Sequence, residues 1–354
     1  MPRVRADELR RIGCLLFEQV GCTPADARTV VDHLVDSSLY GHDSHGQIRI
    51  YEYIGQIRDG IFDPKGTPHI ESDRPCAAVV DGGGALGQIG GTFATQLAID
   101  KARQHGVATV TLRNTSHVGR VGAYPLQIAR AGLVGIVFCN AGHLGRQIAP
   151  YGGLDGKLST NPIAFAAPRR SAEPILVDMT TSVCAEGKIR VASNKGVALP
   201  AGCIIDAQGN PSTDPQDYLG NPPGAMLPLG GPVAYKGYCL SFIVEILGGA
   251  LSGQGCAAGE RVMQSNGLCI TAYHIDHFAD RDAYFDEIEA LIGHVRSSRI
   301  DPKVGEILLP GDPEYRSAKE REQAGIPIDN TTWERIQRAG SDLGLDVHTW
   351  QTLD

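Results

Sequence analysis

Two histidines, an aspartate, a serine and an arginine are concentrated in one stretch of nine residues. Its sequence is Gly41-His42-Asp43-Ser44-His45-Gly46-Gln47-Ile48-Arg49, and it follows a segment predicted as helix. A second helix that begins at about Gly46 would place His45, Arg49 and Tyr53, which are spaced by four, along one face. That face would offer an imidazole to move a proton, a guanidinium to hold a carboxylate, and a phenol. We therefore take it as a candidate site.

Four further polar clusters occur where a strand or turn gives way to another element. In the first, Ser116-His117 precedes a predicted helix, so that backbone N–H groups and His117 would face an anionic ligand such as a diphosphate. The other three are Ser159 to Pro162, Asp178 to Ser182 with Glu186-Gly187-Lys188 after it, and Tyr235 to Tyr238. Each has a plain structural alternative: Ser116, Asp178 and Thr180 as caps, His117 as a structural histidine, and Lys236 as a snorkelling side chain.

A glycine-rich turn resembles a dinucleotide fingerprint but lacks its second half. Gly82, Gly84 and Gly87 satisfy G-x-G-x-x-G between a predicted strand and a predicted helix. The next strand ends in Arg113-Asn114, with no acid to hold a ribose, although an arginine there would suit NADP. With 44 glycines in the chain, chance matches are common. We interpret the turn as a structural one.

Two pairs of histidines suggest a different class of enzyme as an alternative, a metal-dependent hydrolase. His42-Asp43-Ser44-His45 and His274-Ile275-Asp276-His277 each have an acid between two histidines. Helical zinc sites prefer histidines four residues apart, which neither pair provides, so no metal is expected. A non-catalytic metabolite-binding protein is a further alternative.

Composition narrows the classes of partner. The formal net charge of −8 over 354 residues, without a block of basic residues, argues against nucleic-acid and anionic-membrane partners. The first residues contain no apolar export signal. Nine cysteines include no C-x-x-C pair, which favours a reducing, cytoplasmic compartment. Those with apolar neighbours are expected to be buried: Cys139, Cys184, Cys203, Cys239 and Cys269.

Strands that alternate with helices predict an α/β core of two or more regions. Expected strands are 76–81, 107–112, 133–138, 163–167, 175–178 and 268–273; the short connection before 175 predicts a mixed sheet. Expected helices are 6–20, 24–39, 46–59, 87–104, 119–131, 236–251, 281–296, 313–324 and 332–343. Residues 209–232 are rich in glycine and proline, which predicts a lid, a crossover or a partner-facing arm.

Several motifs together resemble the type-2 malate/L-lactate dehydrogenase family. They are GHDSHGQIR, NTSHVGRVGAY, STNPIAFAAP, DMTTSVCAEGK, YKGYCLSFIVEILGGALSG and LLPGDPE, in the family's order from about residue 6 to 345. Residues 202–206 and Ile326-Pro327 look most like the hydroxycarboxylate dehydrogenase branch. The resemblance implies a homodimer with a non-Rossmann, mixed-sheet nucleotide-binding domain. We expect an N-terminal helical region at 1–75, the nucleotide-binding domain at 76–265 and a C-terminal region at 266–354 that packs back on the first.

The resemblance also implies roles for individual residues. The family reduces 2-oxo acids or cyclic imino acids with NADH or NADPH, and Ser44 and His45 match its Ser-His pair, whose histidine is the proton donor. His117 matches a residue treated as the acid/base in parts of the family, so both histidines stay candidates. Arg49 matches the residue that holds the substrate carboxylate. Other substrate contacts are expected from Tyr53, Thr160 and Lys188, and a lysine at 188 favours 2-oxo over imino acids. Residues expected to line NAD or NADP are His117, Val118, Gly119, Arg120, Val121, Asp178, Met179, Thr180 and Lys236.

Overall fold

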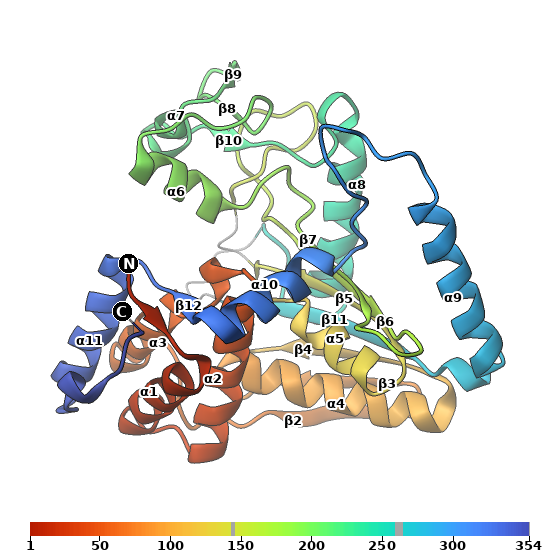
Figure 1. The fold of residues 1–354 in the computed structure, drawn as a ribbon, viewed down its shortest axis with the longest axis horizontal. Coiled ribbons are helices and arrows are strands. Elements are labelled where there is room, and N and C mark those ends of the chain that lie inside the picture. The colour runs from red at the N-terminus through yellow and green to blue at the C-terminus, as the bar shows by residue number, and fades with distance from the viewer. Residues whose placement is uncertain (143–145, 259–264, 354) are drawn as a thin grey trace.

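A seven-stranded mixed sheet forms the centre of the protein in a computed structural model that describes residues 1–142, 146–258 and 265–353. Figure 1 shows the sheet edge-on within the lower body. In spatial order its strands are β2 (His69–Arg74), β3 (Ala77–Asp81), β4 (Val107–Arg113), β11 (Gly267–Tyr273), β5 (Val134–Asn140), β6 (Ile163–Ala167) and β7 (Ile175–Met179). Only β3 and β4 run parallel. The predicted mixed sheet is confirmed. The domain boundary expected between residues 265 and 266 lies just before β11, which is the central strand of the sheet.

Two helices cover one face of this sheet. They are α4 (Gly87–His105) and α5 (Ala123–Arg130), whose inward residues Ala98, Ile99 and Ile128 pack on strand residues such as Val110 and Ile270. The helix predicted from residue 119 begins only at Ala123. A positive φ of 74° at Gly119 belongs to the loop that precedes it.

The N- and C-terminal parts of the chain form one helical layer. It contains α1 (Ala6–Gln19), α2 (Pro24–Leu39), α3 (Ile48–Arg58), α10 (Asp312–Ala324) and α11 (Asn330–Asp342). Thr23 accepts a hydrogen bond from the Asp26 N–H and caps α2, and Pro24 occupies the first position of the helix. Strand β1 (Arg3–Val4) pairs with β12 (Ile326–Pro327), so the two ends of the chain lie close together (Figure 1). The apolar core of this helical layer includes Leu16, Leu34, Ile50 and Ile336.

A small lobe stands apart from the body. It consists of α6 (Glu186–Lys195), β8 (Ile204–Ile205), β9 (Pro211–Ser212), α7 (Pro215–Leu219) and β10 (Ala225–Met226), and its three strands form a sheet of their own. Ile189, Ile204, Tyr218 and Met226 pack into a separate core. The segment predicted as a loop-rich arm is therefore part of a packed lobe. Short strands of two residues have no periodicity that the sequence could reveal.

The helix predicted over 236–251 has two parts. It is α8 (Tyr235–Val244) followed by the π-helix η4 (Glu245–Ala250), where the Glu245 carboxylate is buried and accepts from Asn161 Nδ2 at 2.8 Å. Cys239 on α8 is exposed, contrary to expectation, whereas Cys139, Cys184, Cys203 and Cys269 are buried as predicted. In the described part of the chain no helix is long and apolar enough to cross a membrane.

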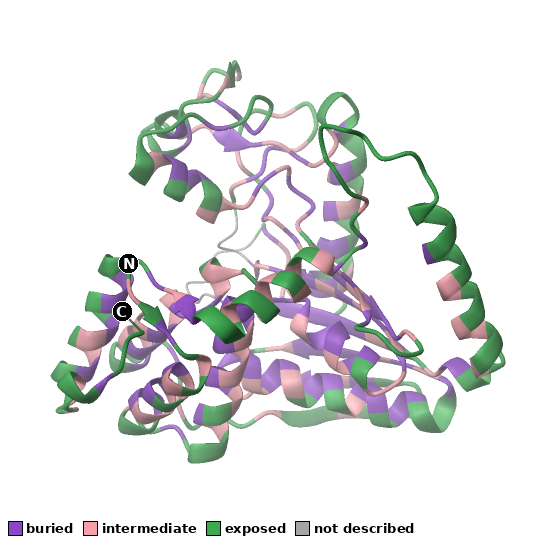
Figure 2. Cartoon of the chain, in the orientation of Figure 1, coloured by how far each residue is buried: buried purple, intermediate pink, exposed green. Residues whose placement is uncertain are grey.

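Helix α9 (Arg281–Arg296) packs loosely against the rest of the molecule. Ile292 is its one buried residue in the described structure, and Figure 2 shows most of its surface exposed. Two arginines that follow β6 attach it: Arg169 to Glu289 at 2.8 Å, and Arg170 to Asp286 at 2.6 Å. The remaining short helices are 3-10 turns: η1 (Asp43–His45), η3 (Gly231–Val233), η5 (Ile275–His277) and η6 (Val347–Thr349).

Candidate active site

The histidine-rich stretch forms a 3-10 turn rather than the start of a helix. His45 ends η1, and α3 begins at Ile48, so His45 does not share a helical face with Arg49 and Tyr53 as predicted. Gly46 separates the two elements with a φ of −104° and a ψ of −134°. A Cβ at Gly46 would lie 2.1 Å from Ser38 Oγ, so only glycine lets the turn approach α2 this closely.

Helix α10 and Arg49 hold this turn in place. Asp43 pairs with Arg321 at 2.5 Å, and His42 Nε2 lies 3.5 Å from Glu314. Arg49 Nε donates to the Ser44 carbonyl at 2.8 Å, and the Ser44 hydroxyl lies 3.1 Å from His45 Nδ1. The side chains of His42 and Asp43 are thus occupied with support, which leaves Ser44, His45 and Arg49 at the open side.

A second histidine from a distant segment completes the centre of the site. The His117 ring lies parallel to that of His45, with centroids 5.5 Å apart and planes inclined by 18°. Its Nδ1 lies 2.6 Å from the hydroxyl of Tyr53 on α3. The glycine turn at 82–87 lets the backbone of His117 lie close to the start of α4, because a Cβ at Gly87 would lie 2.4 Å from the His117 carbonyl oxygen. Ser116 Oγ accepts from the Gly87 N–H at 2.8 Å and caps α4.

Both imidazoles are neutral near pH 7. Burial, and after it the Arg49 guanidinium, lowers the pKa of His45 to about 3. Burial also holds the pKa of His117 well below its usual value, again with Arg49 as the next cause. Burial raises the pKa of Tyr53 to about 12, so the phenol keeps its proton. The site therefore contains two proton acceptors and one fixed cation.

The loop that carries His117 does not offer a free row of backbone N–H groups. Side chains from elsewhere already accept from three of them: Asn266 Oδ1 from Val118 at 2.9 Å, His33 Nε2 from Arg120 at 2.9 Å, and Asp178 Oδ2 from Gly122 at 3.0 Å. These three N–H groups are therefore engaged within the protein, and a diphosphate site at this helix start stays a prediction. Val118, Gly119 and Val121 are buried within the loop.

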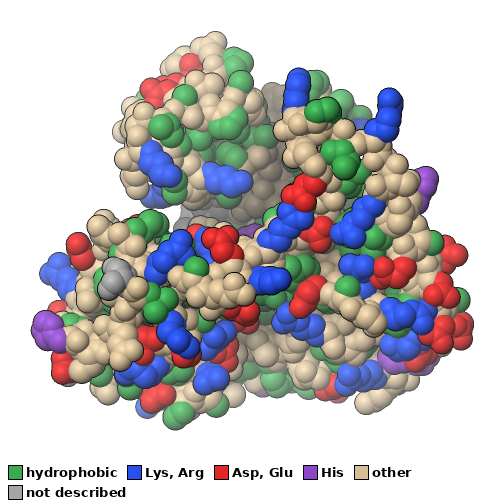
Figure 3. All heavy atoms as spheres, viewed as in Figure 1, with side chains coloured by type: hydrophobic (Ala, Val, Ile, Leu, Met, Phe, Trp, Pro, Cys, Tyr) green, Lys and Arg blue, Asp and Glu red, His purple; other side chains and the backbone are tan. Residues whose placement is uncertain are grey.

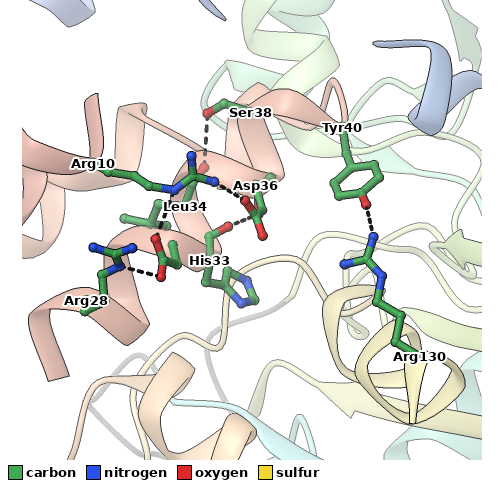
Figure 4. A network of polar contacts seen from close by, with 10 residues as sticks. Arg10, Arg28, His33, Leu34, Asp36, Ser38, Tyr40 and Arg130 are labelled. Atoms are coloured by element: carbon green, nitrogen blue, oxygen red, sulfur yellow. Dashed lines mark hydrogen bonds and ion pairs between the residues drawn. The ribbon is translucent and has the colours of Figure 1, made fainter. Parts of the chain in front are cut away.

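His33 is a residue that the sequence did not single out. It lies within α2, where nothing in the local pattern distinguishes it from a solvent-facing histidine. In Figure 4 its imidazole points away from the contact that Arg10 of α1 makes with Asp36 of α2. Burial lowers the pKa of His33 to about 3, so its Nε2 stays available as an acceptor for the Arg120 N–H. His33 therefore fixes the loop beside His117.

The two arginines considered for a cofactor phosphate are both engaged. Arg113 pairs with Glu71 of β2. The Arg120 side chain is 2% exposed, stacks on the Tyr40 ring at 4.7 Å and has its Nη1 3.5 Å from Asp178 Oδ2. Tyr40 in turn accepts a hydrogen bond from Arg130 at 2.8 Å (Figure 4). Arg120 Nε and Nη1 have no hydrogen-bond partner within the residues that the structure describes.

The other predicted residues lie on a few segments that contact one another. Figure 3 shows a hollow between the small lobe and the body. Thr160 accepts at its carbonyl from the Thr181 N–H at 2.9 Å, and the Thr181 carbonyl accepts from Leu229 at 2.9 Å. Gly237 donates to Leu229 at 3.2 Å, which brings the start of α8 and Lys236 to the same segment. Met179 at the end of β7 is exposed, as are Lys188 and Lys236; Thr180 is half-buried. A Cβ on Gly187 would lie 3.3 Å from Ser44 Cβ, so α6 begins directly beside the turn.

Comparison with known proteins decides the family. The model of the malate/L-lactate dehydrogenase family matches residues 4–337. The chain belongs to this family. Hydroxycarboxylate dehydrogenase B of Escherichia coli K12 is 37% identical over 343 residues, which are 96% of this chain and 93% of that protein. Malate dehydrogenase of Pyrococcus horikoshii is 33% identical over 97% of this chain and 96% of its own.

Solved structures agree with this membership of the malate/L-lactate dehydrogenase family. Sulfolactate dehydrogenase of Methanocaldococcus jannaschii superposes with a TM-score of 0.88 at 31% identity, covering 98% of this chain and 99% of that one. Malate dehydrogenase of Entamoeba histolytica gives 0.91 at 28% identity, covering 97% and 98%. A piperideine-2-carboxylate reductase of Pseudomonas syringae gives 0.80 at 30% identity, covering 96% and 100%. This family member is thus a 2-hydroxy acid/2-oxo acid oxidoreductase.

Proposed function

We propose that this protein interconverts a small 2-oxo acid and its 2-hydroxy acid with NADH or NADPH, at the site formed by His45, His117 and Arg49. The observation that carries the proposal is the parallel pair of neutral imidazoles, 5.5 Å apart, beside a half-buried guanidinium. A carboxylate on the guanidinium would set the adjacent keto carbon near both rings. Family membership supplies the class of reaction.

Proton transfer falls to His45 in this proposal. Arg49 holds the substrate carboxylate through a charge-assisted contact that uses Nη2, since within the described residues Nε and Nη1 are the atoms engaged by Ser44 and Glu52. In the oxidation direction neutral His45 takes the hydroxyl proton, which matches the form that burial favours in the free site. In the reduction direction His45 returns that proton to the developing alkoxide. Ser44, 3.1 Å from His45 Nδ1, orients the ring.

The residues near Lys236 fit a nicotinamide dinucleotide. Helix α8 begins without a side-chain cap, and the exposed Lys236 lies in its first turn, so a cation stands at a helix N-terminus; the Gly237 N–H there is already paired with the Leu229 carbonyl. This combination suits a diphosphate. Lys236, with Asp178, Met179 and Thr180 on the adjoining segment, would hold the nucleotide, whose nicotinamide supplies or accepts the hydride. The absorbance assay described below distinguishes NADH from NADPH as the nucleotide used.

Cyclic imino acids are the second candidate substrate class. The structural similarity to the piperideine-2-carboxylate reductase favours them, and the same Arg49 contact would hold their carboxylate. The exposed lysine at position 188, beside the Ser44 turn, favours 2-oxo acids instead.

The test is an absorbance assay at 340 nm with both nucleotides. The panel contains pyruvate, oxaloacetate, 2-oxoglutarate, phenylpyruvate, hydroxypyruvate and one cyclic imine. Oxidation of NADH or NADPH with any 2-oxo acid, together with loss of activity in His45→Ala, is the expected result. Turnover with the imine alone would replace the first candidate by the second, and turnover with none would refute both.

We also propose a homodimer in a reducing cytoplasm. The nine cysteines are free, and α8 with η4 exposes an apolar face: Phe242, Ile243, Ile246 and Leu251 are each 43–58% exposed. These four side chains lie on α8 and η4 or directly after them, and exposed apolar patches mark interaction sites in soluble proteins. Light scattering should report twice the mass of one 37.7 kDa chain, and Ile246→Glu should lower it towards one. A monomeric wild type at micromolar concentration would exclude the dimer.

A further inference from the structure

A chain of three side chains determines which nitrogen of His117 carries a proton. Gln88, fully buried on α4, contacts both the His117 carbonyl oxygen at 3.2 Å and the Tyr53 hydroxyl at 3.3 Å through the same amide atom. A backbone carbonyl oxygen only accepts hydrogen bonds, so this atom of Gln88 is the NH2 group. The His117 carbonyl oxygen therefore fixes the orientation of the Gln88 amide.

The Tyr53 hydroxyl must then donate to His117. Its oxygen accepts from Gln88, and the side chain is 1% exposed, so its own proton needs an acceptor inside the protein. His117 Nδ1, 2.6 Å away, is that acceptor. An imidazole that accepts at Nδ1 and is neutral carries its proton on Nε2.

We propose that Gln88 and Tyr53 lock His117 as the Nε2–H tautomer, so that His117 donates a hydrogen bond to the substrate oxygen while His45 alone transfers the proton. This inference rests on the proposed function and refines it, because it assigns the two histidines to different tasks. Gln88 and Tyr53 are positioning residues in it. A fixed donor aimed at a developing alkoxide stabilises the transition state without changing its own charge.

The contacts at Nδ1 differ between the two rings in the way this division requires. Neighbouring groups oppose a positive charge on both rings: Arg49, His45 and His33 on His117, and Arg49, His42 and Arg120 on His45. His117 Nδ1, however, faces the Tyr53 hydroxyl, which Gln88 orients. His45 Nδ1 instead meets the exposed Ser44 hydroxyl, which can turn to donate or to accept. His45 can therefore exchange its proton during turnover, whereas His117 has a single stable arrangement.

Gln88 shows one further sign of a fixed arrangement. Its Oε1 is buried and has no hydrogen-bond partner among the described residues. Turning the amide over would place that oxygen against the His117 carbonyl oxygen, two acceptors facing each other. The unpaired oxygen is the consequence of keeping the NH2 group on Tyr53 and His117.

Two substitutions at position 88 separate the lock from simple packing. Gln88→Glu replaces the donor by an acceptor, so Tyr53 would donate to the carboxylate and accept from His117, which moves the imidazole proton to Nδ1. Gln88→Met removes the donor without supplying an acceptor, so Tyr53 can either donate to His117 or accept from it, and both tautomers become populated. Both side chains have nearly the volume of glutamine, and circular dichroism and thermal unfolding check that each variant folds.

The measurement is 15N NMR of the histidine-labelled, full-length protein, with the His117 signals identified by their loss in His117→Asn. We expect one Nε2–H tautomer from pH 6 to 9 in the wild type, both tautomers in Gln88→Met and an Nδ1–H tautomer in Gln88→Glu. A single Nε2–H tautomer in Gln88→Met would remove Gln88 from the lock. An Nδ1–H or doubly protonated His117 in the wild type, or an unchanged tautomer in Gln88→Glu, would overturn the inference.

Single-turnover reduction provides the second readout. Loss of one preorganised donor should slow hydride transfer in Gln88→Glu by about 100-fold, with a much smaller change in substrate KM. Gln88→Met, in which part of the population keeps the Nε2–H donor, should be slowed by less. Equal slowing in both variants would reduce Gln88 to a packing residue. The NMR arm needs no substrate or nucleotide, so the tautomer can be refuted while the oxidoreductase activity stands, and the reverse also holds.

Discussion

Replacing Arg49 by alanine should weaken substrate binding specifically. Arg49 Nε already donates to the Ser44 carbonyl at 2.8 Å, and Nη1 to Glu52 at 2.5 Å, which fixes the plane of the guanidinium. Its side chain is still 25% exposed, so a solute can reach the remaining donors. A hydrogen bond between charged groups contributes about 1.5–3 kcal/mol, which corresponds to a roughly 10- to 150-fold increase in the KM of the 2-oxo acid.

The assay is steady-state kinetics with the 2-oxo acid and the nucleotide varied separately. KM for the nucleotide should stay within about twofold, because the proposed nucleotide contacts, Asp178, Met179, Thr180 and Lys236, do not include Arg49. Arg49→Lys should give an intermediate KM, since it keeps the charge and loses the planar fork. Arg58→Ala is the matched control on the same helix: its partner Asp342 is 3.7 Å away, both are half-exposed, and neither KM should change.

Equal effects of Arg49→Ala on both constants would refute the reasoning. So would an unchanged substrate KM accompanied by a lower kcat, since a residue that only supports the Ser44 turn would disturb chemistry rather than carboxylate binding.

Three further predictions follow from the contacts around the site. His45→Ala should slow single-turnover hydride transfer by about 100- to 10,000-fold at unchanged nucleotide affinity, and near-normal transfer would remove its acid/base role. His33 has a pKa of about 3 when folded and about 6.5 when unfolded, so the unfolded state binds the extra proton: stability is full above pH 6.5 and falls as the pH drops towards 3. His33→Gln should therefore reduce the difference in urea midpoint between pH 7 and pH 5, and an unchanged difference would exclude His33 as its source. Asp43→Ala and Arg321→Ala should show a coupling of roughly 1 kcal/mol in a double-mutant cycle of unfolding, with Lys319→Ala as the additive control; strict additivity would show that the pair contributes nothing.

Local sequence patterns were sufficient for most of the helices and for the strands of the large sheet. Regular apolar spacing marks α1, α2 and α11, and short apolar runs mark β4, β5 and β11, because these elements bury one face or both. The pattern failed where packing overrides it. His69–Arg74 is almost entirely exposed and forms an edge strand without alternation, and the two-residue strands of the small lobe are too short to have a period.

The site shows the same division between local and distant information. Ser44, His45 and Arg49 could be chosen from their spacing and from the family resemblance, since they are neighbours in the chain. The helical face expected for His45 was wrong, because Gly46 interrupts the backbone there. Gln88 and His33 could not be found, because their importance depends on contacts 29 and 87 residues away in sequence, which no local pattern encodes.

The electrostatics of the site connect substrate binding to proton transfer. Burial and then Arg49 lower the pKa of His45, and the same guanidinium is the group proposed to hold the substrate carboxylate. A bound carboxylate would neutralise part of that cation and so raise the pKa of His45 above its value in the free enzyme. The free site would then contain a neutral base suited to a 2-hydroxy acid, and a bound 2-oxo acid would itself increase the protonation of His45 that its reduction requires. His117, locked by Tyr53, would keep its single proton throughout, so one imidazole responds to the substrate charge and the other does not.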